Sequence, residues 1–206
     1  TAAVATNTRI SSVFLFGLVG ILYIIKLSVS KEWTKRNFMI GLTAVVSFAG
    51  FYYLLSPAAW RDPLGFIGYT LARSSDFSAW PGIVYFWGTI HRPVPSFYIP
   101  VMIGVTTPLL LLLLIVTGHI TSIIELVKDI KAKNFSISTS IYVLCMVYIW
   151  TFLLFAIIRR PILYNSWRHF YFLYGAMLIL AVGSVRFFMH LLKGKWKWLP
   201  VGAIGV

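Results

Sequence analysis

Arginine and histidine side chains gather in one stretch of the sequence, residues 159–171, between two long apolar segments. Its basic residues are Arg159, Arg160, Arg168 and His169. Cations at the edge of a hydrocarbon segment are costly unless an anion, water or a functional role compensates them. The nearest acidic residues, Asp129 and Glu125, lie a whole apolar segment away in the sequence. The partner is therefore a carboxylate brought near by folding or an anion that is not on this chain.

Arg168 and His169 directly precede an apolar segment, which puts them at the level of the lipid phosphates of a bilayer. A planar guanidinium binds phosphate or carboxylate in two places and stays charged when partly buried. The start of a helix adds backbone N–H donors, and His169 offers a second donor or stays neutral. We expect a lipid phosphate here; the alternative is that both side chains are only packed or paired within the protein.

Further candidates for this chemistry lie in the loops that the apolar segments leave on the same side. They are Arg61, His91, Arg92, Tyr98 and Tyr164. The two tyrosine hydroxyls would contact sugar or phosphate, although an aromatic belt at the membrane interface explains them equally well. Trp60, Trp80, Trp87 and Trp167 suit stacking on a sugar ring or, again, the belt.

The elements that must position these side chains are membrane-spanning helices. The chain has 206 residues, of which 59% are hydrophobic and 11% are charged, and a mean hydropathy of +0.86. Soluble domains carry about 25% charged residues. Five apolar runs reach the roughly 20 residues that cross a bilayer: 11–29, 38–56, 98–118, 141–158 and 170–189. A sixth begins near residue 198, so the sequence predicts an all-α polytopic membrane protein.

The segments between these runs differ in character. Residues 57–97, rich in Trp, Tyr, Phe, Pro and Gly, predict one structured outer loop at the membrane interface. Within it, 64–73 fits a short amphipathic helix that starts after Asp62-Pro63. Residues 119–140 predict a polar loop on the opposite side, where Glu125 and Asp129 lie one helical turn apart on a solvated face.

The basic residues assign the two sides. If each apolar run crosses the membrane, all nine lysines lie on one side together with Arg36 and Arg186, and the other side has only arginines. Those seven are Arg9, Arg61, Arg73, Arg92, Arg159, Arg160 and Arg168. The richer side is cytoplasmic by the positive-inside rule, so 57–97 and 159–169 lie outside. Topology signals do not distinguish Arg from Lys, so they do not explain why one side has only arginines. We expect these arginines to bind an oxyanion; the alternative is that they pair with Asp62, Asp76 or carboxylates elsewhere.

Other chemistries find little support in the sequence. The four histidines have no metal-ligand spacing with acids or with Cys145, and there is no glycine-rich phosphate loop. A single cysteine allows no disulfide within the chain, and Cys145 is expected to be a small buried apolar residue. The net charge of +13 lies in short loops between apolar runs, which favours membrane lipids over nucleic acid as a partner.

Two stretches of the sequence resemble a known enzyme family. Ser96-Phe97-Tyr98-Ile99-Pro100 with Thr107-Pro108-Leu109, and Tyr164 through Phe170, resemble motifs of bacterial GT-C membrane glycosyltransferases. The likeness is to the protein-mannosyltransferase and aminoarabinose-transferase type and covers about residues 55–180. The sequence departs from the second motif at Ser166, where glycine is usual.

The resemblance implies an inverting transfer of a sugar from a polyprenyl-phosphate donor to an acceptor of unspecified kind outside the membrane. It implies no cofactor; a divalent metal assists some relatives, but no ligands for one are evident. It also implies a catalytic carboxylate in a first outer loop, and no acidic residue here matches that position. We therefore expect a piece of a larger protein, residues 1–206 forming one transmembrane region, that binds donor phosphate but is inactive alone. The expected location is the bacterial inner membrane.

Two alternatives to this enzyme remain open. A transporter or flippase of lipid-linked sugars would use the same arginines without chemistry, but the apolar runs show few ionisable residues at mid-depth and no repeat. A non-enzymatic membrane scaffold would leave the segregation of arginine and lysine unexplained. An upstream outer loop with one or two carboxylates would favour the enzyme.

Overall fold

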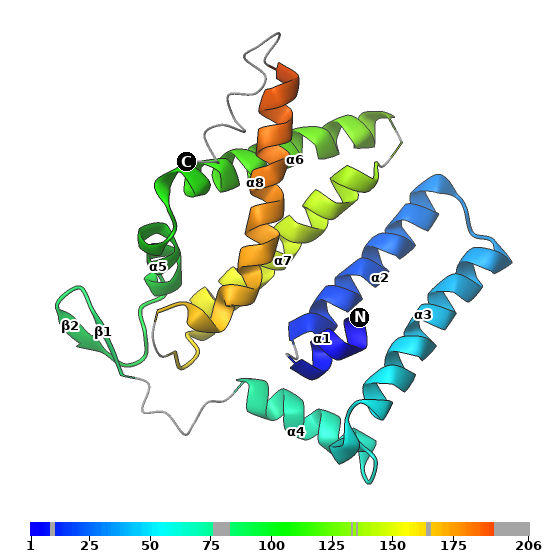
Figure 1. Cartoon of the computed structure of the whole chain (residues 1–206), viewed down its shortest axis with the longest axis horizontal. Helices are drawn as coiled ribbons and strands as arrows, with labels where there is room; N and C mark the ends of the chain where they lie inside the picture. Colours follow the sequence, from blue (N-terminus) through cyan, green and yellow to red (C-terminus); the bar gives the residue numbers. More distant parts are fainter. Residues whose placement is uncertain (9–10, 76–82, 133, 135, 164–165, 192–206) are drawn as a thin grey trace. The chain divides into compact units, whose positions relative to one another are not determined.

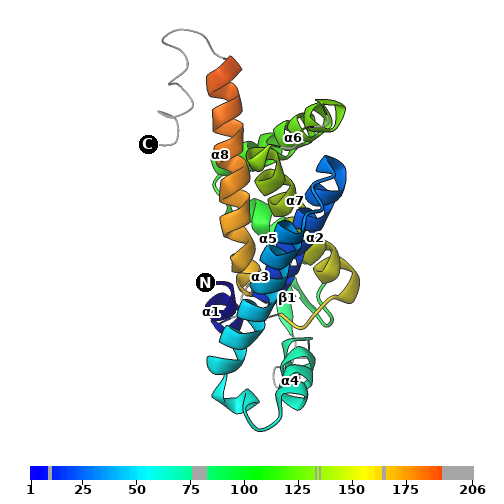
Figure 2. The ribbon, with the colours of Figure 1, turned by 90° about the vertical axis from the view of Figure 1, so that its right-hand side faces the viewer.

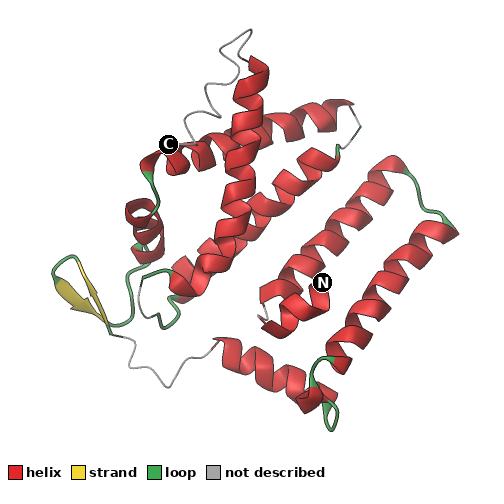
Figure 3. Cartoon of the chain, in the orientation of Figure 1, coloured by secondary structure: helices red, strands yellow, loops and turns green. Residues whose placement is uncertain are grey.

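The computed structural model describes residues 1–8, 11–75, 83–132, 134, 136–163 and 166–191. Contacts divide the chain into two compact units, Thr1–Pro81 and Gly82–Val206. Both units are helical, and the described residues form strands only in one short hairpin (Figure 3).

The first unit contains a pair of long helices with shorter ones around it. In chain order they are α1 (Ala2–Thr8), α2 (Ser11–Ser30), α3 (Lys35–Leu54), the 3₁₀ turn η1 (Pro57–Ala59) and α4 (Pro63–Ser75). The helices α2 and α3 confirm the first two predicted spans. The short connection between them, residues 31–34, ends at Thr34, which caps α3 by accepting a hydrogen bond from the Asn37 N–H at 3.2 Å.

Aromatic side chains join α2 to α3. The rings of Phe16 and Phe48 stack with centroids 4.3 Å apart, and the Tyr23 hydroxyl donates to the Asn37 carbonyl at 2.9 Å. No residue of α3 is buried. Because such an apolar helix is left without a covering protein layer, its surface is suited to lipid or to further protein.

The predicted amphipathic helix at 64–73 is confirmed as α4. Asp62 accepts a hydrogen bond from the Gly65 N–H at 2.9 Å, which satisfies one of the free donors of the first turn. A Cβ on Gly65 would collide with the Asp62 carboxylate, so glycine at this position leaves room for the cap. Asp62 is thus held at the start of α4.

The second unit contains the hairpin and three long helices (Figure 1). Its elements are β1 (Val84–Phe86), β2 (Thr89–His91), α5 (Tyr98–Thr106), α6 (Leu109–Ala132), α7 (Ile137–Arg159), the 3₁₀ helix η2 (Arg168–Leu173) and α8 (Tyr174–Leu191). The strands β1 and β2 are antiparallel, with Tyr85 opposite Ile90. The described parts of the predicted loop 57–97 therefore contain regular elements: η1, α4 and the β1–β2 hairpin.

The third predicted span is wrong in its position. The sequence predicted one helix over 98–118, but the structure divides it into α5 and α6 at Thr107-Pro108, and the candidate span is Leu109–Ala132. Thr107 adopts an extended conformation (φ −89°, ψ 132°), the usual one before proline. The predicted polar loop 119–140 is wrong for the same reason, because α6 continues to Ala132 and α7 begins at Ile137.

Small residues let α6, α7 and α8 approach closely, and α6 crosses α8 in both views (Figures 1 and 2). A Cβ on Gly118 of α6 would overlap the Leu180 carbonyl of α8. Thr117 and Ser184 share a hydrogen bond at 2.5 Å across the same contact. Such small residues with hydroxyl hydrogen bonds are typical of helix contacts in membranes.

Five helices are long and apolar enough to span a membrane: Ser12–Ser30, Lys35–Leu54, Leu109–Ala132, Ile137–Arg159 and Arg168–Leu191, the last joining η2 to α8. They confirm the all-α, polytopic fold class. The predicted sixth span lies outside the described residues.

Candidate functional site

The structure brings together the two stretches that carry the sequence motifs. Trp167 belongs to the second stretch and is 3% exposed. Its indole N–H donates a hydrogen bond of 2.8 Å to the Thr106 hydroxyl at the end of α5. Residues 61 positions apart are thereby joined directly, so Trp167 fixes η2 against α5.

Tyr98 provides a second link between the same segments. It is the first residue of α5 and is 3% exposed. Burial raises the pKa of the Tyr98 phenol above its usual value, while a hydrogen bond with the Ser166 backbone lowers it by less. Tyr98 is therefore a neutral, buried side chain that packs the start of α5 against the residues before η2.

The connection from α7 to η2 contains two residues in the left-handed conformation. Arg160 ends α7 with φ 44°, and its N–H donates to the Ala156 carbonyl at 3.1 Å. Ser166 has φ 65°. Ser166 replaces the glycine that is usual in the resembled motif, and its conformation is one that favours glycine. A residue with a side chain thus occupies a left-handed position in this connection.

Arg168 is exposed at the first position of η2, at one end of the candidate span Arg168–Leu191. Within the described residues, no oxygen accepts a hydrogen bond from its guanidinium. His169 next to it is half-buried. The buried neighbours Trp167 and Phe170 hold this turn, the Phe170 N–H donating to the Trp167 carbonyl at 2.8 Å. The arginine is therefore positioned by buried neighbours, and its guanidinium is exposed to a possible anion.

His91 and Arg92 lie at the end of β2, next to the hairpin that precedes α5. The Thr89 hydroxyl and the His91 Nε2 are 2.8 Å apart and share a hydrogen bond. Phe86 of β1 contacts Tyr98 with ring centroids 5.0 Å apart, which ties the hairpin to the start of α5. Arg92 is exposed and has no ion-pair partner among the described residues.

Two further predicted site residues are not among the described residues of the second unit. Arg61 belongs to the first compact unit, between η1 and α4, and is exposed. Its neighbour Asp62 caps α4, and no ion pair joins the two side chains. Tyr164 lies outside the described residues.

The sequence analysis missed the hairpin and Thr106. Trp87 (φ 50°) and Gly88 (φ 78°) form the two-residue turn between β1 and β2, and two positive φ angles are typical of a type I′ turn. The sequence signal for the hairpin was a glycine between two short runs of aromatic and β-branched residues. Trp87 is 74% exposed at the tip, whereas Trp167 is used in packing.

No group of three or more His, Cys, Asp or Glu side chains in the described residues is arranged to hold a metal ion. The candidate site residues described above are arginine, histidine and aromatic residues.

The five long apolar helices define the class of this protein as an integral, multi-pass membrane protein. Comparisons with protein-family models, with curated proteins and with solved structures give no match for the chain.

Proposed function

We propose that this chain is the part of a GT-C-type membrane glycosyltransferase that holds the phosphate of a polyprenyl-phosphate sugar donor. The observation that carries the proposal is the contact between the two motif stretches, made by the Trp167–Thr106 hydrogen bond beside the Tyr98–Ser166 contact. These two contacts position an exposed Arg168 at the end of an apolar helix.

Arg168 is the residue that binds the donor phosphate in this proposal. A guanidinium offers two parallel N–H donors to two phosphate oxygens. The isoprenoid tail of the donor lies among the apolar helices, so its phosphate reaches the level of η2. Arg92 adds a further positive charge next to the hairpin that precedes α5, and the imidazole rings of His91 and His169 are further polar groups of this unit.

The reaction breaks the bond between the sugar C1 and the phosphate oxygen and forms a bond from C1 to the acceptor oxygen or nitrogen. The acceptor proton goes to a carboxylate that lies outside this chain. Negative charge grows on the leaving phosphate, and Arg168 stabilises it there. The chain therefore supplies donor binding and leaving-group stabilisation, and the acceptor is activated elsewhere.

Arg168→Ala tests this role in the full-length protein in membranes. Loss of charge-assisted hydrogen bonds, each about 1.5–3 kcal/mol, lowers donor affinity by roughly tenfold or more. Arg159→Ala is the matched control, because Arg159 is also exposed, at the end of α7 that leads to η2. The measurements are binding and transfer of a radiolabelled polyprenyl-phosphate sugar, after equal membrane insertion of all variants has been shown.

Wild-type binding and turnover in a well-inserted Arg168→Ala protein would refute the role of Arg168. A flippase is distinguished in the same preparation, because it moves the labelled donor across a vesicle membrane without forming a glycosylated product.

A further inference from the structure

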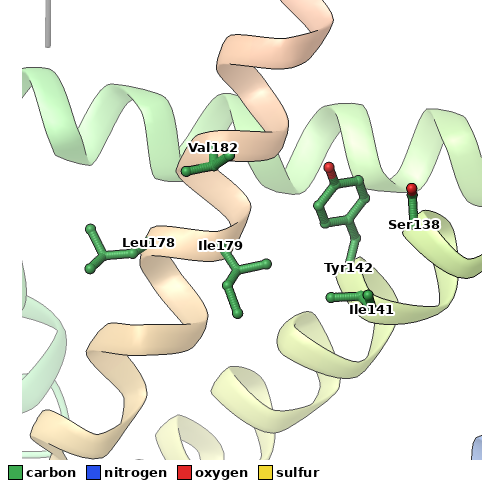
Figure 4. A pocket seen from close by; sticks show the side chains of 6 residues that line it. All are labelled: Ser138, Ile141, Tyr142, Leu178, Ile179 and Val182. Atoms are coloured by element: carbon green, nitrogen blue, oxygen red, sulfur yellow. The ribbon is translucent and has the colours of Figure 1, made fainter.

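A groove lies between α7 and α8, near the end of α7 that is farther from Trp167 and Arg168. Its volume is about 330 Å³, within the range of roughly 300–1,000 Å³ that small-molecule sites occupy. The lining residues are Ser138, Ile141, Tyr142, Leu178, Ile179 and Val182. Figure 4 shows Ile179 directed from α8 toward α7, where Tyr142, Ile141 and Ser138 follow one another.

The groove changes from apolar to polar along its length. Leu178, Val182 and Arg186 follow at intervals of four residues and so share one face of α8. With a rise of about 1.5 Å per residue, Arg186 lies about 12 Å along the helix from Leu178. On the other wall, Ser138 is the second residue of α7, and Ile141 and Tyr142 lie one turn further in.

Arg186 adjoins the groove through its hydrogen bond to the lining residue Ser138. Its Nη1 donates a hydrogen bond of 3.3 Å to the Ser138 hydroxyl, and the side chain is exposed. Within the described residues, no carboxylate is within ion-pairing distance of this guanidinium. Arg186 is thus oriented by one neutral neighbour, while most of its N–H donors and its charge remain uncompensated.

We propose that this groove binds one acyl chain of an anionic phospholipid, with the headgroup phosphate on Arg186 and Ser138. The apolar walls face hydrocarbon because both α7 and α8 are candidate spans. An arginine fork and a hydroxyl suit phosphate oxygens.

Charge selects an anionic lipid over a zwitterionic one. A zwitterionic headgroup brings its own cation to compensate the phosphate, whereas an anionic headgroup leaves a net charge for Arg186. Basic pockets between transmembrane helices are known to bind anionic headgroups for this reason. The site is independent of the proposed donor site, since it uses other residues at the opposite end of α7.

The test uses the full chain in nanodiscs of equal phosphatidylglycerol and phosphatidylcholine, with retained lipid counted by native mass spectrometry after detergent transfer. Wild-type protein retains phosphatidylglycerol preferentially. Arg186→Gln lowers that preference by about fivefold, the effect of one basic residue near a headgroup. Lys128→Gln removes the same charge from an exposed position outside the groove and leaves the preference unchanged.

A second variant tests the apolar part of the site. Ile179 is 42% exposed, so Ile179→Trp fills the groove without disturbing a buried core. It lowers retention of both lipids, whereas Arg186→Gln affects only phosphatidylglycerol.

Equal retention of the two lipids by the wild-type protein would overturn the proposal. So would an equal loss of preference in Lys128→Gln, which would indicate general surface charge. Unchanged retention in a folded Ile179→Trp protein would exclude the groove as the site.

Discussion

Ser166 adopts a backbone conformation that favours glycine, although it carries a side chain. Its φ of 65° places Cβ close to the following carbonyl, which costs roughly 1–2 kcal/mol for a residue other than glycine. The hydroxyl is buried, and no hydrogen-bond partner for it lies among the described residues. Both observations indicate that the connection before η2 is held by its neighbours rather than by Ser166 itself.

Ser166→Gly is expected to stabilise the protein by about 1 kcal/mol, because glycine removes the steric cost and the buried hydroxyl. The measurement is the free energy of unfolding in mixed micelles. Ser166→Ala is the control: it removes the hydroxyl but keeps Cβ, so its gain is smaller. Destabilisation by Ser166→Gly would show that the Ser166 side chain makes a stabilising contact.

At the scale of elements, the α6–α8 contact depends on one glycine. A Cβ on Gly118 would meet the carbonyl oxygen and carbon of Leu180, which are backbone atoms and cannot move aside as a side chain can. Gly118→Ala is therefore expected to destabilise the protein by about 1–3 kcal/mol. At Gly175, in the first turn of α8, an added Cβ would have no atom within 4 Å.

Gly175→Ala is the matched control for Gly118→Ala. Alanine has a higher helix propensity than glycine by about 1 kcal/mol, so this variant is neutral or stabilising. Thermal unfolding in detergent of both variants and the wild type measures the difference. An unchanged melting temperature in Gly118→Ala would mean that the two helices separate at no cost.

Apolar run length was sufficient to predict four of the five spans, because roughly 20 apolar residues suffice to define one. The third was misplaced because 98–106 is as apolar as a span, and only Thr107-Pro108 divides it from α6. The hairpin is too short to show alternation over more than three residues per strand. The contact of Trp167 with Thr106 joins residues 61 positions apart and has no local signal at all.

At the scale of the whole molecule, the distribution of charge and the five spans together predict a topology. The connections at 31–34 and 133–136 follow α2 and α6, so an alternating chain places both on one side of the membrane. We expect that side to be cytoplasmic because of its excess of lysine and arginine. Ala58 and Ile90 lie between the second and third spans and are predicted to be outside.

Single cysteines at four positions test this topology in intact cells with a membrane-impermeant maleimide. Ala58→Cys and Ile90→Cys are expected to react, since Ala58 and Ile90 are exposed, and Glu32→Cys and Asn134→Cys are expected to react only after lysis. The native Cys145 is buried within α7 and gives little background. If Glu32→Cys reacted in intact cells and Ile90→Cys were protected, the topology would be the reverse of the predicted one. Arg168 would then face the cytoplasm, and an outer lipid-linked sugar donor would be excluded as its ligand.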